Sequence, residues 1–118
     1  MDAKAPHALA ATEELHYLSL TAVSELIRTG TVSPVEVTRA LLDRIEALDD
    51  RLQSYTTVTA EHALESARKA EAELAQGIWR GPLHGVPVAV KDLCDTTFAP
   101  TSAGMHIHRD HATAANST

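Results

Sequence analysis

The chain has 118 residues, of which 44% are hydrophobic, so it has the length and apolar content of one modest domain or of part of one. Its 16 acidic residues outnumber 10 lysines and arginines, and the formal net charge of −6 provides no basic surface for nucleic acid or an anionic membrane. Cys94 is the only cysteine, which excludes an intramolecular disulfide, and no stretch approaches the roughly 20 apolar residues of a membrane span. We therefore expect a soluble, cytoplasmic protein whose partner is a small uncharged or cationic molecule, without direct contact to nucleic acid or a membrane.

The N-terminal part predicts an arm followed by a short helix. Residues 1–17 are rich in alanine and show no clear period, which predicts a flexible arm. In "SLTAVSELIRTG", residues 19–30, apolar side chains recur at helical spacing. Thr21 can cap the start of this helix, and Gly30 suits a left-handed residue at its end.

Two longer helices are predicted next. "SPVE" places Ser33 and Glu36 where they can form a reciprocal capping box, and Pro34 takes the first helical position. Apolar residues then recur along one face of the segment that follows. Residues 60–76 contain no glycine or proline and are dominated by alanine, so they predict a third helix that Gly77 ends.

Two segments predict strands. "QSYTTVT", residues 53–59, is dense in β-branched and aromatic residues, and Thr59 can cap the helix that follows. "VPVAV", residues 86–90, has no polar residue on either face, which is typical of a strand covered on both sides, with Pro87 at its start or at a sheet edge. The predicted fold class is α/β, with helices packed on the first strands of a mixed sheet.

Lys91 directly follows the apolar run. In open α/β sheets, ligands and catalytic groups collect at the ends of strands. A lysine amine drawn into apolar surroundings is more easily neutral, and it can then act as a base. Alternatively, the stem lies along the sheet and the charged end reaches water, with Asp92 or Asp95 as a counter-charge. The spacing of these residues does not decide between the two interpretations.

The other candidate residues favour structural roles. Ser102 and Ser117 are interpreted as turn residues, and Cys94 as a small buried side chain beside a strand end. A metal site is not expected from the clustered histidines, because their segment contains no cysteine and no residues that would orient the rings. These histidines are His106, His108 and His111. We predict no metal and no cofactor.

"GPLHGVPVAVKD", residues 81–92, resembles the N-terminal part of the amidase signature family, whose members carry a nearly identical glycine-rich turn, apolar strand and Lys-Asp pair. The preceding order is similar too: a "LT" helix, a long helix opened by "SPVEV", and an alanine-rich helix that ends in glycine. The resemblance extends from about residue 18 to residue 104, with a departure at "SAGM" from the family's Thr-Ala-Gly-Ser-like turn. It implies that residues 18–118 are the truncated N-terminal part of an amidase domain.

The family's catalytic unit is a serine, a second serine in a cis peptide linkage, and a lysine, which the resemblance places at Lys91. It implies hydrolysis of a linear carboxamide without a cofactor. The family's serine loop has no counterpart here, since no Gly-Gly or Gly-Ser pair occurs, so the isolated chain is expected to be inactive. The alternatives are an amidase-like subunit of a glutamine-dependent tRNA amidotransferase and a non-catalytic helical interaction module. The oligomeric state is left open.

Overall fold

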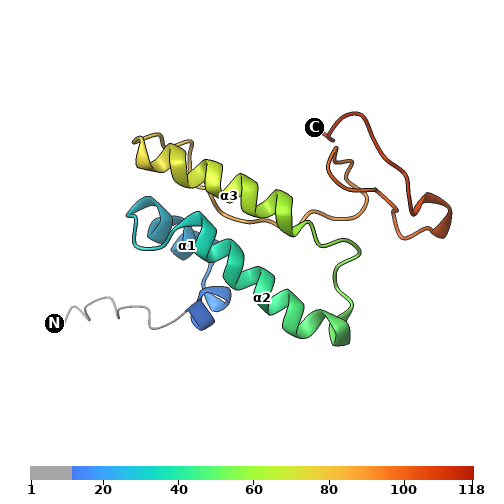
Figure 1. Ribbon diagram of the computed structural model, residues 1–118, viewed down its shortest axis with the longest axis horizontal. Coiled ribbons are helices and arrows are strands. Elements are labelled where there is room, and N and C mark those ends of the chain that lie inside the picture. The colour runs from blue at the N-terminus through green and yellow to red at the C-terminus, as the bar shows by residue number, and fades with distance from the viewer. Residues whose placement is uncertain (1–11) are drawn as a thin grey trace.

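A computed structural model describes residues 12–118 of the protein. Within them, α2 and α3 lie side by side in opposite directions, α1 lies beside the first half of α2, and the remaining chain runs back from the end of α3 into irregular loops (Figure 1). The elements in chain order are the 3-10 helix η1 (Thr12–Tyr17), α1 (Leu20–Arg28), α2 (Pro34–Leu52), α3 (Ala60–Ala75) and the 3-10 helix η2 (His106–His108).

A small apolar core joins η1, α1 and α2. Partly buried apolar residues surround it, among them Leu74 of α3 and Val86 of the later chain. Among residues 12–118, no helix is both long enough and apolar enough to cross a bilayer. The buried members of the core are Leu15, Val23, Ile27, Val37 and Ala40.

The element η1 lies within the segment 1–17 that was predicted as a flexible arm, and the rest of that segment, residues 1–11, lies outside the described residues. Leu15 of η1 is buried in the core. The guanidinium of Arg44 on α2 lies over the ring of Tyr17, 5.3 Å from its centroid. The element η1 therefore contacts α2, with Leu15 in the core and Tyr17 beside Arg44.

The start of α1 corrects one prediction. Its N-cap is Ser19, whose hydroxyl accepts the backbone N–H of Ala22 at 3.2 Å, and Thr21 lies inside the helix. Ser19 is favoured because it lies outside the first turn, where a side-chain oxygen can reach the free N–H groups. Gly30 has a φ of 72°, which confirms the predicted left-handed residue after the helix.

The capping box predicted for α2 is confirmed. The Ser33 hydroxyl accepts the Glu36 N–H at 3.1 Å, and the Glu36 carboxylate accepts the Ser33 N–H at 2.8 Å. Pro34 takes the first helical position, where its missing N–H removes no hydrogen bond.

The strand predicted at residues 53–59 is not formed. Gln53 ends α2 in the left-handed region, with a φ of 49°. The Asp49 carboxylate then accepts the N–H groups of Ser54, at 2.7 Å, and of Tyr55, at 3.4 Å. A strand would need these donors for a neighbouring strand, so Asp49 makes the segment a turn. Thr59 takes the N-cap position of α3 but makes no side-chain capping bond.

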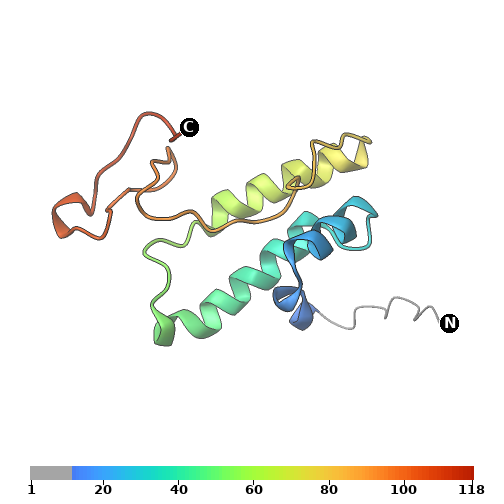
Figure 2. The same ribbon diagram turned by 180° about the vertical axis from the view of Figure 1, so that it is seen from behind.

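The chain after α3 forms no sheet within residues 12–118, where the only bridge joins Thr96 to Ala99. Residues 86–90 run back along the side of α2 and α3, as Figure 2 shows, but no strand pairs with them. Val88 is 67% exposed and Val90 is 53% exposed. The predicted mixed sheet is thus not found in the described part of the chain, because a strand is completed only by the backbone groups of a neighbour. The helices of the predicted α/β fold are present.

Candidate active site

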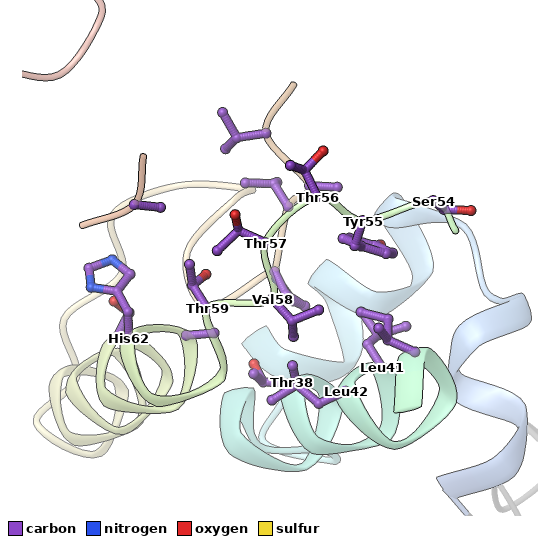
Figure 3. A pocket seen from close by; sticks show the side chains of 18 of the residues that line it. Thr38, Leu41, Leu42, Ser54, Tyr55, Thr56, Thr57, Val58, Thr59 and His62 are labelled. Carbon is purple, nitrogen blue, oxygen red and sulfur yellow. The ribbon is translucent and has the colours of Figure 1, made fainter. Parts of the chain in front are cut away.

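An open groove of about 1080 Å³ lies between α2, α3, the loop 54–59 and the segment 85–92. Figure 3 shows Leu41 and Leu42 of α2, Val58 of the loop and His62 of α3 at this groove. Most of the lining side chains are apolar or small, and Lys91 lies at the end of the segment that forms one wall. The groove therefore brings the candidate base next to an apolar surface.

Lys91 is an exposed residue at the end of the extended segment. Its backbone carbonyl accepts the N–H of Cys94 at 2.9 Å, which turns the chain sharply after the lysine. Among residues 12–118 no ion pair includes Lys91. The apolar enclosure that the sequence allowed for this amine is not formed by the described residues.

Asp92 is held by the turn at residues 101–104. Its carboxylate accepts the backbone N–H of Ser102 at 2.9 Å and also the Ser102 hydroxyl, while its carbonyl accepts the N–H of Ala103 at 2.8 Å. The Ser102 side chain and backbone, together with the backbone of Gly104, lower the pKa of Asp92 below its ordinary value of 3.8. We call this set of contacts the Asp92 clasp. It directs the Asp92 carboxylate toward Ser102, so this carboxylate is not the partner of Lys91.

Asp95 is the other carboxylate weighed as a partner of Lys91. It forms no ion pair with the lysine, and its backbone is bonded to the C-terminal loop. Its N–H donates to the Ser117 hydroxyl at 2.8 Å, and its carbonyl accepts the Ser117 N–H at 2.9 Å. Ser102 and Ser117 therefore tie loops together, in agreement with their prediction as turn residues.

A polar cluster holds the glycine-rich turn that precedes residues 86–90. The Glu73 carboxylate of α3 accepts two hydrogen bonds from the Arg80 guanidinium, at 2.7 and 2.9 Å, and contacts Nε2 of His84 at 3.0 Å. The backbone N–H of Arg80 donates to Nδ1 of His84 at 3.2 Å. Because Nδ1 accepts, the proton of a neutral ring is on Nε2, where it is donated to Glu73. We call these three residues the Glu73 anchor.

The charge of Glu73 is stabilised within this anchor. The hydrogen bonds and charge of Arg80, with a smaller contribution from His84, lower the pKa of Glu73 from 4.5 to about 2, against the opposing effect of its partial burial. His84 is buried, with 9% of its surface exposed, whereas the Arg80 side chain is 63% exposed. The anchor is therefore a buried imidazole oriented by an ionised carboxylate.

Gly85 brings the same turn against α2. Its φ is +79°, and a Cβ at this position would lie 2.6 Å from Cγ of Pro34 and 3.5 Å from Cγ2 of Ile27. Only glycine allows this approach without displacement of the backbone. The turn is thus fixed to α3 through His84 and to α1 and α2 through Gly85.

The remaining candidates do not form a site in the described chain. Within residues 12–118 no three histidine, cysteine or acidic side chains converge as metal ligands. His108 and His111 contact each other edge to face, with ring centroids 5.7 Å apart. Cys94 is a free cysteine of intermediate burial, so it is less buried than predicted.

Sequence reasoning did not single out Glu73, Arg80 or His84. Glu73 lies on the predicted third helix and His84 eleven positions later, after a change in chain direction, so no helical or strand period links them. The available signal was local: a histidine between two glycines, in a turn that leads into an apolar segment. This pattern marks the turn as structured, but it does not identify the partner of the histidine.

Comparisons with known proteins identify the family of the chain. Residues 36–118 match the profile of the family described as Amidase. The Mycobacterium tuberculosis (strain ATCC 25618 / H37Rv) protein named "Putative amidase AmiD" is 52% identical over 101 residues, which cover 86% of this chain and 21% of that protein. A glutamyl-tRNA(Gln) amidotransferase subunit of Moorella thermoacetica is 51% identical over 97 residues, covering 82% of this chain and 20% of that protein.

Solved structures match as well, and one of them is a protein complex. It is described as an unexpected vestigial protein complex that reveals the evolutionary origins of an s-triazine catabolic enzyme. It superposes with a TM-score of 0.79 at 31% identity, covering 84% of this chain and 22% of that one. The chain belongs to the amidase family, and it spans about a fifth of the length of the curated relatives it matches.

Proposed function

We propose that this chain is the part of an amide-hydrolysing enzyme that carries the general base, Lys91. The observation that carries the proposal is the position of Lys91: it ends an apolar segment attached to the helices at one end and held by the Asp92 clasp at the other, beside an apolar groove. Neither neighbouring carboxylate pairs with it in the described chain. Membership of the amidase family supports the type of chemistry.

In the proposed mechanism the neutral Lys91 amine takes a proton through a bridging serine. The nucleophilic serine oxygen attacks the amide carbonyl, and backbone N–H groups stabilise the oxyanion. The C–N bond breaks as Lys91 returns the proton to the departing amine or ammonia, which leaves an acyl-enzyme. Water then attacks the ester carbonyl, releasing the carboxylic acid and restoring the serine. No step of this sequence needs a metal or a cofactor.

The serine pair is proposed to come from the part of the family that these residues do not cover. Ser102 and Ser117 are engaged in loop contacts and do not stand in a glycine-serine pattern. We accordingly expect the 118 residues by themselves to lack amidase turnover. The single cysteine and acidic balance support a cytoplasmic location, a small amide substrate and no nucleic-acid contact of the chain's own.

We also propose that residues 86–90 are a strand of a mixed sheet in a protein as long as the relatives. The exposed side chains of Val88 and Val90 and the apolar groove beside them support this proposal. An apolar segment with free backbone groups is suited to pairing with further strands.

The test of the proposed base uses a protein that includes these residues and has the length of the curated relatives. Lys91→Ala is expected to lower kcat for a simple amide by about 10²- to 10⁴-fold, the usual contribution of general acid-base catalysis. Labelling by a serine-reactive fluorophosphonate should fall in parallel. Lys69→Ala removes an exposed lysine of α3 and is the matched control, with unchanged turnover. Full activity of Lys91→Ala would refute the proposal.

A second candidate is the catalytic subunit of a glutamine-dependent tRNA amidotransferase, which the 51% identity to the amidotransferase protein of Moorella thermoacetica favours. In this case the amide is glutamine, and the released ammonia is passed to an aminoacylated tRNA. The same enzyme preparation distinguishes the two candidates. Turnover of simple amides without partner subunits supports the amidase, and glutamine turnover that requires partner subunits and tRNA supports the amidotransferase.

A further inference from the structure

We propose that Glu73, Arg80 and His84 are positioning residues, which fix the start of the segment that carries Lys91 and thereby set the position of its amine. The inference rests on the proposed function of Lys91. It assigns a role to the Glu73 anchor, whose residues do not themselves touch the groove.

Residues 86–90 are held mainly at their two ends. They have no strand partner within residues 12–118, and among them Val86, next to the near end, packs against the apolar core. The Asp92 clasp ties the far end to residues 101–104, which belong to the same loop region. The near end is tied to α3 by His84 and to α2 by Gly85. The near end is therefore one connection between Lys91 and the helical core, beside the stacking of Phe98 in the loop region on His62 of α3.

The hydrogen bonds within the Glu73 anchor orient each of its three side chains. The Glu73 carboxylate receives Arg80 on both oxygens and His84 on one of them, while His84 receives the backbone N–H of Arg80. Each group thus constrains the next, and the imidazole is held at both nitrogens. An ordinary apolar contact would keep the turn close to α3, but it would not fix the rotation of the ring or of the backbone that follows it.

The ion pair between Arg80 and Glu73 orients the carboxylate of Glu73. The Arg80 side chain is mostly exposed, and exposed ion pairs add little to the stability of a fold. A bidentate guanidinium does fix the plane of a carboxylate, however. The geometry points to an orienting function: Arg80 fixes Glu73, Glu73 fixes His84, and His84 fixes the turn that leads to Lys91.

The kinetic test uses an enzyme that includes these residues and has the length of the curated relatives. In Glu73→Gln, kcat is expected to fall by up to about 100-fold, because a displacement of a catalytic group by about 1 Å has effects of this size, while KM remains within about twofold. Glu71→Gln removes a charge from an exposed position of α3 two residues away and should leave both constants unchanged. An unchanged kcat in Glu73→Gln, or a loss confined to KM, would overturn the positioning role.

Two further variants test the contacts of the two His84 nitrogens one at a time. They also keep the proposal testable if Glu73→Gln does not fold. His84→Gln retains a donor near the Nε2 position, and His84→Asn retains an acceptor near the Nδ1 position. Since the contact to α3 runs through Nε2, His84→Gln should retain more of the wild-type kcat than His84→Asn. The reverse order, with both variants folded by circular dichroism, would contradict the proposal.

A spectroscopic test on the 118-residue chain is independent of catalysis. Nitrogen-15 shifts of His84 should place the proton of the neutral form on Nε2, and Glu73→Gln should shift the Nε2 resonance. Trp79, the only tryptophan, lies 5.9 Å from the His84 ring, so its fluorescence should change in the same variant. If these signatures are present while Lys91→Ala remains active, the proposed function fails and the anchor stands as a structural contact. If they are absent, the anchor itself is refuted.

Discussion

Residues 12–75 and residues 76–118 differ in how the N–H and C=O groups of their backbone are hydrogen-bonded. The first region is three helices and a 3-10 turn, and its core residue Val37 is 2% exposed. The second region has the same kind of side chain at Val88, which is 67% exposed. A helix bonds its N–H and C=O groups within one segment, whereas an extended segment depends on a partner elsewhere in the chain. The difference shows which part of the amidase fold is locally determined.

The second region is held by hydrogen bonds between its loops, made both by polar side chains and by backbone groups. The Thr97 N–H donates to the Asn116 side-chain oxygen at 2.8 Å, and the Thr113 hydroxyl donates to the Thr96 carbonyl at 3.1 Å. The backbone N–H of Thr101 also donates to the carbonyl of His111 at 3.0 Å. Such contacts define loop shape without removing much apolar surface from water, so we expect this region to open before the helices do.

The largest expected effect is at the junction of the two regions. Gly85→Ala combines the cost of a left-handed alanine with the displacement of Pro34, together about 2–5 kcal/mol of unfolding free energy. Gly77→Ala is the matched control, because Gly77 has a φ of +80° with nothing within 4 Å of its would-be Cβ. Urea midpoints by circular dichroism give the difference. Equal effects of the two substitutions would mean that the approach to Pro34 is not tight.

A second experiment makes the same substitution in each region. Val37→Ala removes buried methyl groups and is expected to cost about 2–3 kcal/mol, whereas Val88→Ala should change stability by less than about 0.5 kcal/mol. The measurement is denaturant unfolding of the 118-residue chain. In a protein of the relatives' length the cost of Val88→Ala should rise toward that of Val37→Ala, if residues 86–90 join a sheet there. A persistently small cost would argue against that sheet.

A smaller effect is expected within the helical region alone. Ser33→Ala removes one half of the capping box of α2 and should cost about 1 kcal/mol. Ser54→Ala is the control, since only the backbone of Ser54 is bonded to Asp49. The difference should appear in the thermal midpoint of the helical signal. A helix that tolerates Ser33→Ala without loss would show that packing alone determines where α2 begins.

The smallest expected effect is a pH dependence of the free energy of unfolding, caused by Glu73. The pKa of Glu73 is about 2 in the folded chain, below its ordinary value of 4.5, so its ionised form stabilises the fold above pH 4.5. This contribution is lost as the pH falls from 4.5 toward 2. The stability difference between the wild type and Glu73→Gln, from urea midpoints, should therefore shrink over this range. A difference that is constant with pH would mean that the charge of Glu73 is not stabilised.

The sequence predicts elements whose signals are local. The capping box at Ser33 and Glu36 identifies the start of α2 because both partners lie within one turn. The strand predicted at residues 53–59 is wrong because Asp49, from the preceding helix, binds the N–H groups that follow Gln53. Residue propensity carries no information about a carboxylate contributed by a neighbouring element.

The candidate site likewise has one residue that the local sequence predicts and several contacts that it does not predict. Lys91 is predicted from an unbroken motif, and its role as a base remains a prediction. The Glu73 anchor is not predicted, because the contact from Glu73 to His84 depends on how the turn folds back onto α3. The Asp92 clasp likewise joins residues ten positions apart without a repeating pattern. Long-range polar contacts of this kind follow from the fold and are not visible in the order of residues.

The open segment at residues 86–90 has a consequence for the behaviour of the chain in solution. The N–H of Val86 is bonded to the carbonyl of Leu83 and Pro87 has none, but residues 88–90 pair with no strand in the described chain, and such an extended apolar run is a template onto which a second copy can add. Lys91 and Asp92 follow the run directly, and charges in that position are known to discourage such addition. On this physical basis we expect the charge of Lys91 to oppose self-association, so concentrated solutions of Lys91→Ala should scatter more light than those of the wild type.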